Sequence, residues 1–449
     1  MTNPQNSKTD ATAMNTQDSK KLTTIELVNK NLAKRYRAEL RFRAYGIASI
    51  GFGLLCLCLL FTDIIGKGHT AFMQTYVQLD VHMDADLLEI NDVSDVNQLA
   101  RADYQGVLKQ SLRTKFSDVK SRGDKRKLYK LVSNGAGFEL RKLLEKNPDM
   151  LGTTSTRWVL VDDDIDTYVK SRGGLGAEPA ADTFTGRLSE MQIGWVETLI
   201  SEDKIDKKFN TIFFQVGDSR EPELAGIRGA IMGSIYTMLV TLALSFPIGV
   251  AAAIYLEKYA KKNAFTEFIE VNINNLAAVP SIIYGLLGLA IFISFFEMPR
   301  SMPLLGGLVL TLMTLPTIII SSRAAIKAVP PSIEEAAMGI GASKMQVILH
   351  HVLPLAMPGM LTGAIIGMAQ ALGETAPLLM IGMVAFIVDV PGGITDPATV
   401  LPVQIFLWSD SPERAFVEKT SAAIMVLLAF LIIMNTFAVW LRKRLERRW

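Results

Sequence analysis

Six long apolar runs, separated by polar or charged segments, constrain the fold of this chain more than any other feature. A helix needs about 20 predominantly apolar residues to cross a hydrocarbon core roughly 30 Å thick. The runs that meet this requirement lie near residues 45–65, 227–255, 273–296, 304–322, 361–388 and 421–441. The pattern predicts an all-α polytopic membrane protein with six transmembrane helices.

One long segment, residues 66–225, is too polar to span a membrane. A composition of 49% hydrophobic and 20% charged residues fits membrane spans combined with one sizeable soluble part. Within the segment, alternation predicts strands at residues 72–81, 158–161 and 211–216, and residues 124–146 have a helical pattern. We predict an inserted extracytoplasmic α+β domain. Its basic stretch at 120–130 is either a solvated helix face or a binding surface for an acidic partner or an anion.

The distribution of basic residues predicts that both termini are cytoplasmic. Residues 1–18 are polar and expected to be disordered, and a basic segment then precedes the first span. That segment is too long, and its apolar run too extended, for a signal peptide. Basic residues also mark the alternate short connections, whereas a long inserted domain crosses regardless of its charge. The predicted parts are a cytoplasmic tail (1–43), a first transmembrane helix (44–65), the extracytoplasmic domain (66–225), a transmembrane domain (226–441) and a basic tail (442–449).

The polar loop at residues 328–358 carries strong helix signals between two apolar runs. Each of its helix starts has a capping box, in which a hydroxyl is followed three residues later by a carboxyl or amide: Ser332 with Glu335, and Ser343 with Gln346. Gly341 can adopt the left-handed conformation that closes the first helix, predicted over 332–340. The second helix is predicted to end at Pro354. Two short helices joined at a glycine suit a knob that fits a partner's groove.

Several residues of this loop resemble the EAA loop of binding-protein-dependent ABC importer permeases: Glu335, Ala336, Ala337, Gly341, Leu353 and Pro354. One departure is His351, which stands where the family pattern has an isoleucine. The resemblance implies a cytoplasmic coupling helix that docks on an ATPase subunit. A capped surface helix is the alternative interpretation of the same residues.

Two further runs, at residues 274–289 and 373–379, are similar to the A-type permease subunit of bacterial high-affinity phosphate importers. The resemblance covers about half of the chain and leaves out most of the inserted domain. It implies a subunit in the bacterial inner membrane with four kinds of partner: a homologous second permease, a pair of ATPase subunits, an extracytoplasmic phosphate-binding protein and phosphate itself. ATP and Mg²⁺ would bind to the ATPase, so we expect no cofactor and no nucleic acid on this chain.

Small and polar residues recur at three- and four-residue steps in the third apolar run, which predicts one shared helical face: Asn274, Ala277, Ala278, Ser281, Tyr284, Gly285 and Gly288. Such a face serves either close helix packing or the lining of a pathway. The hydroxyls of Ser281 and Tyr284 could hydrogen-bond a passing oxyanion. Asn274 is the third pathway candidate in this run.

Glu374 lies near the middle of the predicted span 361–388, where a charged carboxylate costs about 2.5 kcal/mol or more. It is expected to be protonated or paired with an arginine, from this chain or from a second permease subunit, and a structural hydrogen-bonding role is the alternative. Gln370 stands where the resembling permeases often have an arginine. Arg323 is therefore this chain's candidate partner, and Thr375 completes the set of pathway candidates.

No set of residues predicts catalysis or a metal site in this chain. His350 and His351 are adjacent, so on a helix they point in different directions, and Cys56 and Cys58 lie inside an apolar run. ATP hydrolysis is expected on another polypeptide. Two other functions stay open: an importer of another oxyanion, such as sulfate or molybdate, and a membrane receptor with an extracytoplasmic sensing domain.

Overall fold

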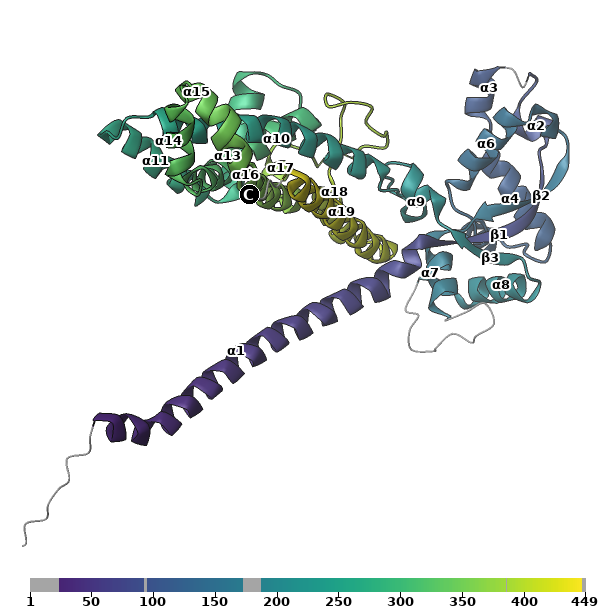
Figure 1. Cartoon of the computed structure of the whole chain (residues 1–449). Helices are drawn as coiled ribbons and strands as arrows, with labels where there is room; N and C mark the ends of the chain where they lie inside the picture. The colour runs from purple at the N-terminus through teal and green to yellow at the C-terminus, as the bar shows by residue number, and fades with distance from the viewer. Residues whose placement is uncertain (1–23, 93–94, 173–186, 385, 446–449) are drawn as a thin grey trace, which may run out of the picture. The chain divides into compact units, whose positions relative to one another are not determined.

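The computed structural model describes residues 24–92, 95–172, 187–384 and 386–445 (Figure 1). The predicted disordered segment 1–18 and the last part of the basic tail, 446–449, lie outside these ranges. The chain divides into two compact units, Met1–Asp63 and Ile64–Trp449. The predicted domain boundaries are not tested by this division, and they stay predictions.

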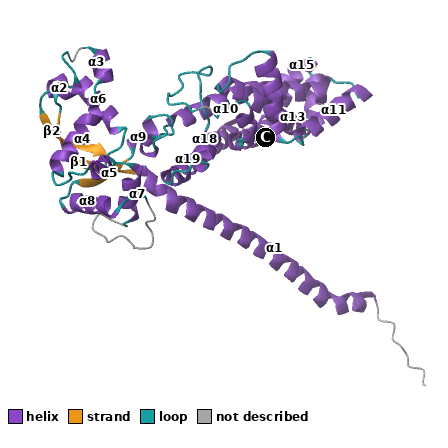
Figure 2. Cartoon of the chain, turned by 180° about the vertical axis from the view of Figure 1, so that it is seen from behind, coloured by secondary structure: helices purple, strands orange, loops and turns teal. Residues whose placement is uncertain are grey.

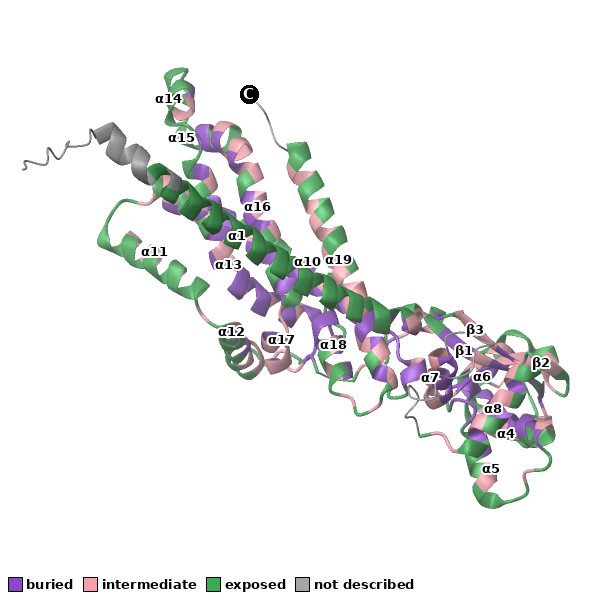
Figure 3. Cartoon of the chain, turned by 90° about the horizontal axis from the view of Figure 1, so that it is seen from below, coloured by how far each residue is buried: buried purple, intermediate pink, exposed green. Residues whose placement is uncertain are grey.

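The first unit consists of the N-terminal part of helix α1, Thr24–Gly68. The prediction of a first membrane-crossing helix agrees with its length and composition, because the stretch Lys34–Phe72 is apolar enough to span. Its apolar side chains, such as Ile50 and Phe52, are exposed (Figure 3). Exposed apolar side chains over such a length are expected where lipid, not water, surrounds a helix.

The inserted segment contains the strands of the described chain, drawn in orange in Figure 2. Strand β1 (Met73–His82) is central and pairs antiparallel with β2 (Thr154–Leu160) and β3 (Ile205–Phe209). Two of the three predicted strands are confirmed as β1 and β2. The alternation of buried and exposed residues along β1 places Val77, Leu79 and Val81 in the domain core.

Helices complete this domain: α2 (Ala85–Leu88), α3 (Val96–Arg101), α4 (Tyr104–Lys115), α5 (Arg122–Tyr129), α6 (Ala136–Lys146), α7 (Asp163–Ser171), α8 (Glu190–Ser201) and α9 (Thr211–Gln215). The predicted helix 124–146 is two helices, α5 and α6. The predicted strand 211–216 is wrong, because this segment forms α9. The Asn210 side chain accepts a hydrogen bond from the Phe213 N–H at 3.0 Å, which caps the helix start.

The C-terminal half is helical. Its long helices are α10 (Arg228–Ile254), α13 (Pro303–Lys327), α16 (Leu353–Gly373) and α19 (Ala415–Leu445), with the shorter α18 (Leu401–Ser409) packed on α19. Helices α10 and α16 both pack against α13 (Figure 1). Five helices in the described residues are long and apolar enough to cross a membrane, or six if one bent pair counts as a span. The predicted all-α membrane fold with an added α+β domain is confirmed.

The bent pair corrects the third predicted span, 273–296. Helix α11 (Ala264–Ala277) ends before Pro280, and α12 (Ser281–Gly288) continues as a π-helical turn (Leu289–Phe295) at 103° to α11. Proline restricts the residue before it to extended conformations, so the helix cannot pass straight through. The predicted single face is therefore wrong, since Asn274 and Ala277 lie on one helix and Ser281 and Tyr284 on another.

The fifth predicted span, 361–388, is also corrected. The crossing helix covers Lys344–Gly373, which comprises α15 (Lys344–Val347), a π-helical turn (Ile348–Val352) and α16. Glu374 follows the end of this helix in extended conformation (φ −75°, ψ 124°), and a short helix α17 (Ala376–Met380) comes next. Glu374 is thus in a break between helices, and Pro377 lies in the first turn of α17, a position that proline favours.

Candidate coupling loop and translocation pathway

The loop forms a compact knob, which we call the coupling knob, residues 331–347. It contains α14 (Pro331–Gly339), the turn at Gly341 and α15. Gly341 has φ +94°, so its predicted left-handed conformation is confirmed. The Gly341 N–H donates to the Met338 carbonyl at 2.9 Å, and the Ala342 N–H donates to the Ala337 carbonyl at 3.1 Å. This is a Schellman motif, which satisfies the last carbonyls of α14.

One of the two predicted capping boxes is present. Ser343 Oγ accepts from the Gln346 N–H, while Gln346 Oε1 accepts from the Ser343 N–H at 2.9 Å. The Ser332 box is wrong, because α14 begins one residue earlier, at Pro331, without a side-chain cap. Proline at the first helical position already supplies a helical φ and lacks the N–H that a cap would satisfy. The second helix also does not end at Pro354, since it continues into α16.

The EAA residues divide between the knob's base and its surface. Ala337 is buried, at 4% exposure, in a core cluster with Val250 of α10 and Ile326 of α13. Glu335, Ala336 and Gly341 are exposed, and Leu353 and Pro354 are half-buried at the start of α16. Three large apolar side chains are exposed on the knob, and we call them the knob tip: Met338, Ile340 and Met345. Ile340 is 84% exposed, which leaves this tip available to a partner.

A π-helical turn at the end of α10, Tyr255–Tyr259, braces the knob. Lys258 forms an ion pair with Glu334 of α14. The Tyr259 hydroxyl donates to Met345 Sδ at 3.3 Å, and Lys344 Nζ lies 4.9 Å from the centre of the Tyr259 ring. The knob is therefore held to α10 by polar contacts from both of its helices as well as by its apolar base.

The small residues of α12 serve close packing. A Cβ atom on Gly285 would lie 2.7 Å from Pro377 Cα of α17. A Cβ atom on Gly288 would collide with Cγ2 of Val309 of α13. The packing interpretation of these glycines is confirmed, because a side chain larger than hydrogen would collide with a neighbouring helix.

The remaining pathway candidates lie at or near two helix breaks, residues 278–280 and 374–375. Ser281 and Thr375 are half-buried where helices begin, and Asn274 is exposed on α11. Tyr284 is 4% exposed, and its hydroxyl donates to the Leu276 carbonyl across the first break at 2.7 Å. Non-helical backbone at membrane depth is tolerated only where it is buried in protein or lines a wet cavity.

Arg323 is not the partner of Glu374. Its Nη2 lies 2.7 Å from Glu270 of α11, and its Nε lies 3.6 Å from Glu257 of the π turn. Within the described part of the chain, the Glu374 side chain makes no ion pair or hydrogen bond. The predicted pairing of these two residues is wrong, and the pathway roles of both stay predictions.

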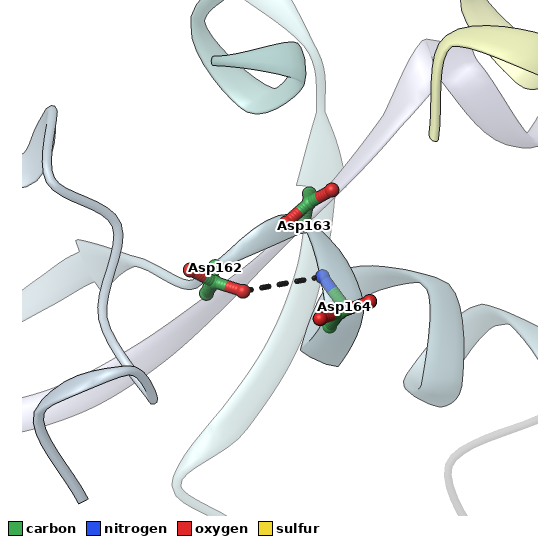
Figure 4. A group of neighbouring side chains, drawn as sticks. All are labelled: Asp162, Asp163 and Asp164. Carbon is green, nitrogen blue, oxygen red and sulfur yellow. Dashed lines mark hydrogen bonds between the residues drawn. The ribbon is translucent and has the colours of Figure 1, made fainter. Parts of the chain in front are cut away.

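A cluster of three aspartates in the inserted domain was not identified from the sequence (Figure 4). Oxygens of Asp162, Asp163 and Asp164 lie within 4.8 Å of one another, a spacing that could hold a metal ion. Asp162 caps α7 by accepting from the Asp164 N–H at 3.3 Å, and acidic residues favour the first turn of a helix. Burial and the charges of Asp163 and Glu223 raise the pKa of Asp162 to about 8. Helix capping is sufficient to explain this acidic run.

A polar junction between the inserted domain and α19 was also missed. Lys170 of α7 lies 3.3 Å from Glu418. Lys419 is buried, and its Nζ donates to the Ala225 carbonyl at 2.9 Å. The two residues of each contact are more than 190 residues apart in the sequence, so no local sequence pattern predicts these contacts.

Two sequence families match the chain. Residues 245–449 match the binding-protein-dependent transport system inner membrane component. Residues 29–176, which include most of α1 and of the inserted domain, match a domain of unknown function, DUF3333.

Curated relatives align with about half of the chain. The probable ABC transporter permease protein YqgI of Bacillus subtilis is 28% identical over 48% of this chain and 77% of its own length. The phosphate transport system permease protein PstA of Yersinia pestis is 30% identical over 47% of this chain and 71% of its own length. A chain of the inward-facing methionine ABC transporter MetNI aligns at 17% identity, over 49% of this chain and 96% of its own, with a TM-score of 0.41. From the family match and the PstA relative together, the chain belongs to the ABC importer permeases, in the PstA family.

Proposed function

We propose that this chain is a permease subunit of an ATP-driven importer of inorganic phosphate, and that the coupling knob connects it to the ATPase. The observation that carries the proposal is the knob itself, with its buried base, its two-sided brace and its exposed apolar tip. The phosphate permeases among the relatives support the substrate. In this proposal the subunit lies in the bacterial inner membrane, and both of its termini are cytoplasmic.

The knob has the features of a docking element. Interface cores are enriched in methionine and other apolar side chains, and the tip offers Met338, Ile340 and Met345 beside the exposed carboxylate of Glu335. Ala336 and Gly341 leave room for close approach of the ATPase surface. ATP and Mg²⁺ bind to that ATPase, and this chain supplies no catalytic group.

The phosphate route passes the two helix breaks. Helix α12 begins at Ser281 without a side-chain cap, and helix starts favour anions. Ser281 and Thr375 add hydroxyl donors. Glu374 would repel phosphate, so it is assigned a positioning role, paired with a cation from the second permease subunit. An extracytoplasmic phosphate-binding protein delivers the substrate.

Uptake of radiolabelled phosphate into a strain that lacks the chromosomal gene tests this function. Wild-type chain is expected to restore uptake, and unlabelled sulfate or molybdate is expected not to compete. Gly341→Asp adds a negative charge to the exposed surface of the knob as well as a side chain at a positive φ, so it should lower uptake while leaving the chain in the membrane, and Gly339→Ala, two residues away, should not. Competition by sulfate or molybdate would assign another oxyanion. Absence of an ATPase after purification in mild detergent would favour a receptor instead.

A further inference from the structure

Among the α-helices of the described C-terminal half, Arg228–Leu445, helix α11 is held differently from the others. None of its residues is buried, and none belongs to a hydrophobic core cluster (Figure 3). In the described residues, two polar side-chain contacts connect α11 to other helices: Glu270 with Arg323 at 2.7 Å, and the Leu276 carbonyl with the Tyr284 hydroxyl at 2.7 Å. A segment with few buried apolar contacts opens or shifts at low free-energy cost.

A cavity of about 530 Å³ separates the N-terminal half of α11 from α13 and the π turn. Arg323 lies in its wall with Glu257, Glu270 and Lys327. The Arg323 side chain is only 15% exposed, so its charge needs partners. Its Nε is buried without a hydrogen bond and lies 3.6 Å from Glu257, a separation that a small shift of the π turn would close.

The π turn touches both the knob and Arg323. Its Lys258 and Tyr259 bind the knob through Glu334 and Met345. The adjacent residue of the same turn, Glu257, faces Arg323. A displacement of the knob therefore reaches Arg323 through one five-residue turn, and Arg323 reaches α11, which ends at the first helix break.

We propose that Arg323 is a positioning residue of the transport cycle: it clamps α11 to the π turn that braces the coupling knob, so that movement of the knob changes the break at residues 278–280. This inference rests on the proposed coupling function and deepens it. Arg323 acts through Glu257 and Glu270 and does not contact the substrate. Its contribution is to keep the knob and the break moving together.

The test uses the complete transporter, reconstituted in vesicles, with ATP hydrolysis and oxyanion uptake measured side by side. Glu270→Gln removes the charge that holds α11 and keeps the side-chain shape. We expect uptake per ATP hydrolysed to fall at least about fivefold, the lower range of allosteric coupling between sites. Glu270→Asp, which keeps the negative charge, should retain more of the coupling than Glu270→Gln. Glu267→Gln is the matched control, because Glu267 lies on the same helix and forms no ion pair within the described residues.

A second readout follows α11 directly. The rate of thiol labelling at Phe268→Cys, in a chain lacking Cys56 and Cys58, should change on trapping with ATP and vanadate. In Glu270→Gln this change should disappear. Equal losses of ATP hydrolysis and uptake, or a labelling change that survives Glu270→Gln, would overturn the clamp. If the transporter carries an oxyanion other than phosphate, uptake per ATP hydrolysed is measured with that oxyanion. The clamp is then tested independently of which substrate is transported.

Discussion

Gly341→Ala isolates the backbone geometry of the coupling knob. The φ of +94° is one that L-residues with a side chain rarely adopt. A Cβ atom at this position would meet nothing within 4 Å, so the substitution adds no steric collision. The expected cost is therefore purely conformational, about 1–2 kcal/mol.

This cost is below the roughly 5–15 kcal/mol by which folded chains are typically stable, so the chain should still fold and reach the membrane. At the knob it acts on the Schellman turn, whose two hydrogen bonds fix the angle between α14 and α15. A penalty of about 1–2 kcal/mol corresponds to a factor of roughly 5–30 in an equilibrium constant. Coupled phosphate uptake should fall by up to this factor, while chain abundance stays unchanged.

Gly339→Ala is the matched control. Gly339 is the last residue of α14, and it also has open space around it, but it has no positive φ. Alanine is favoured over glycine in a helix by about 0.5–1 kcal/mol, so this variant should transport normally. Gly341→Asn should lose less than Gly341→Ala, because asparagine visits the left-handed region more readily. Equal activity of the two alanine variants in the reconstituted uptake assay would refute the reasoning.

Three further substitutions test other parts of the structure by thermal unfolding of the purified chain. Tyr284→Phe removes the hydrogen bond across the first break and should cost about 1 kcal/mol, seen as a lower Tm. Gly285→Ala forces a Cβ against the backbone of α17 and should cost about 1–3 kcal/mol, whereas Gly373→Ala, with open space around it, should leave Tm unchanged. Burial opposes ionisation of Glu197, but hydrogen bonds led by the one from Arg172 outweigh it and lower its pKa below 4.5. This group therefore stabilises the fold above about pH 4.5 and loses that effect as the pH falls, so Glu197→Gln should lower Tm at pH 6 and make no difference in strong acid.

Local chemistry made the knob predictable from the sequence. The left-handed glycine at 341 and the capping box at Ser343 each depend on a few neighbouring residues, and both are present. The error at Ser332 also comes from local signals, because the sequence has two adjacent helix-start signals there, Pro331 as a first helical residue and Ser332 as a cap. Pro331 can start a helix by itself, and the helix starts at the proline.

Long-range contacts explain what the sequence could not predict. Hydropathy reports that residues 273–296 and 361–388 are apolar, but it does not report the direction of the backbone. Both runs are interrupted, and α12 and α17 pack against each other after the breaks. The ion pairs of Arg323 join segments 53 to 66 residues apart, and no local pattern predicts them, so the sequence left Arg323 as a candidate partner of Glu374.

The two ends of the permease half are built for different amounts of movement. Next to the inserted domain, Phe213, Trp408 and Phe416 form a continuous aromatic cluster, and the buried Lys419 lies 5.3 Å from the Phe213 ring. A close-packed core of this kind has few intermediate arrangements. At the knob end, α11 has no buried residue and is held by polar contacts that can exchange partners with little change in packing. From this difference we expect that a displacement of the knob bends the chain at the first break, while the inserted domain, α18 and α19 keep their packing.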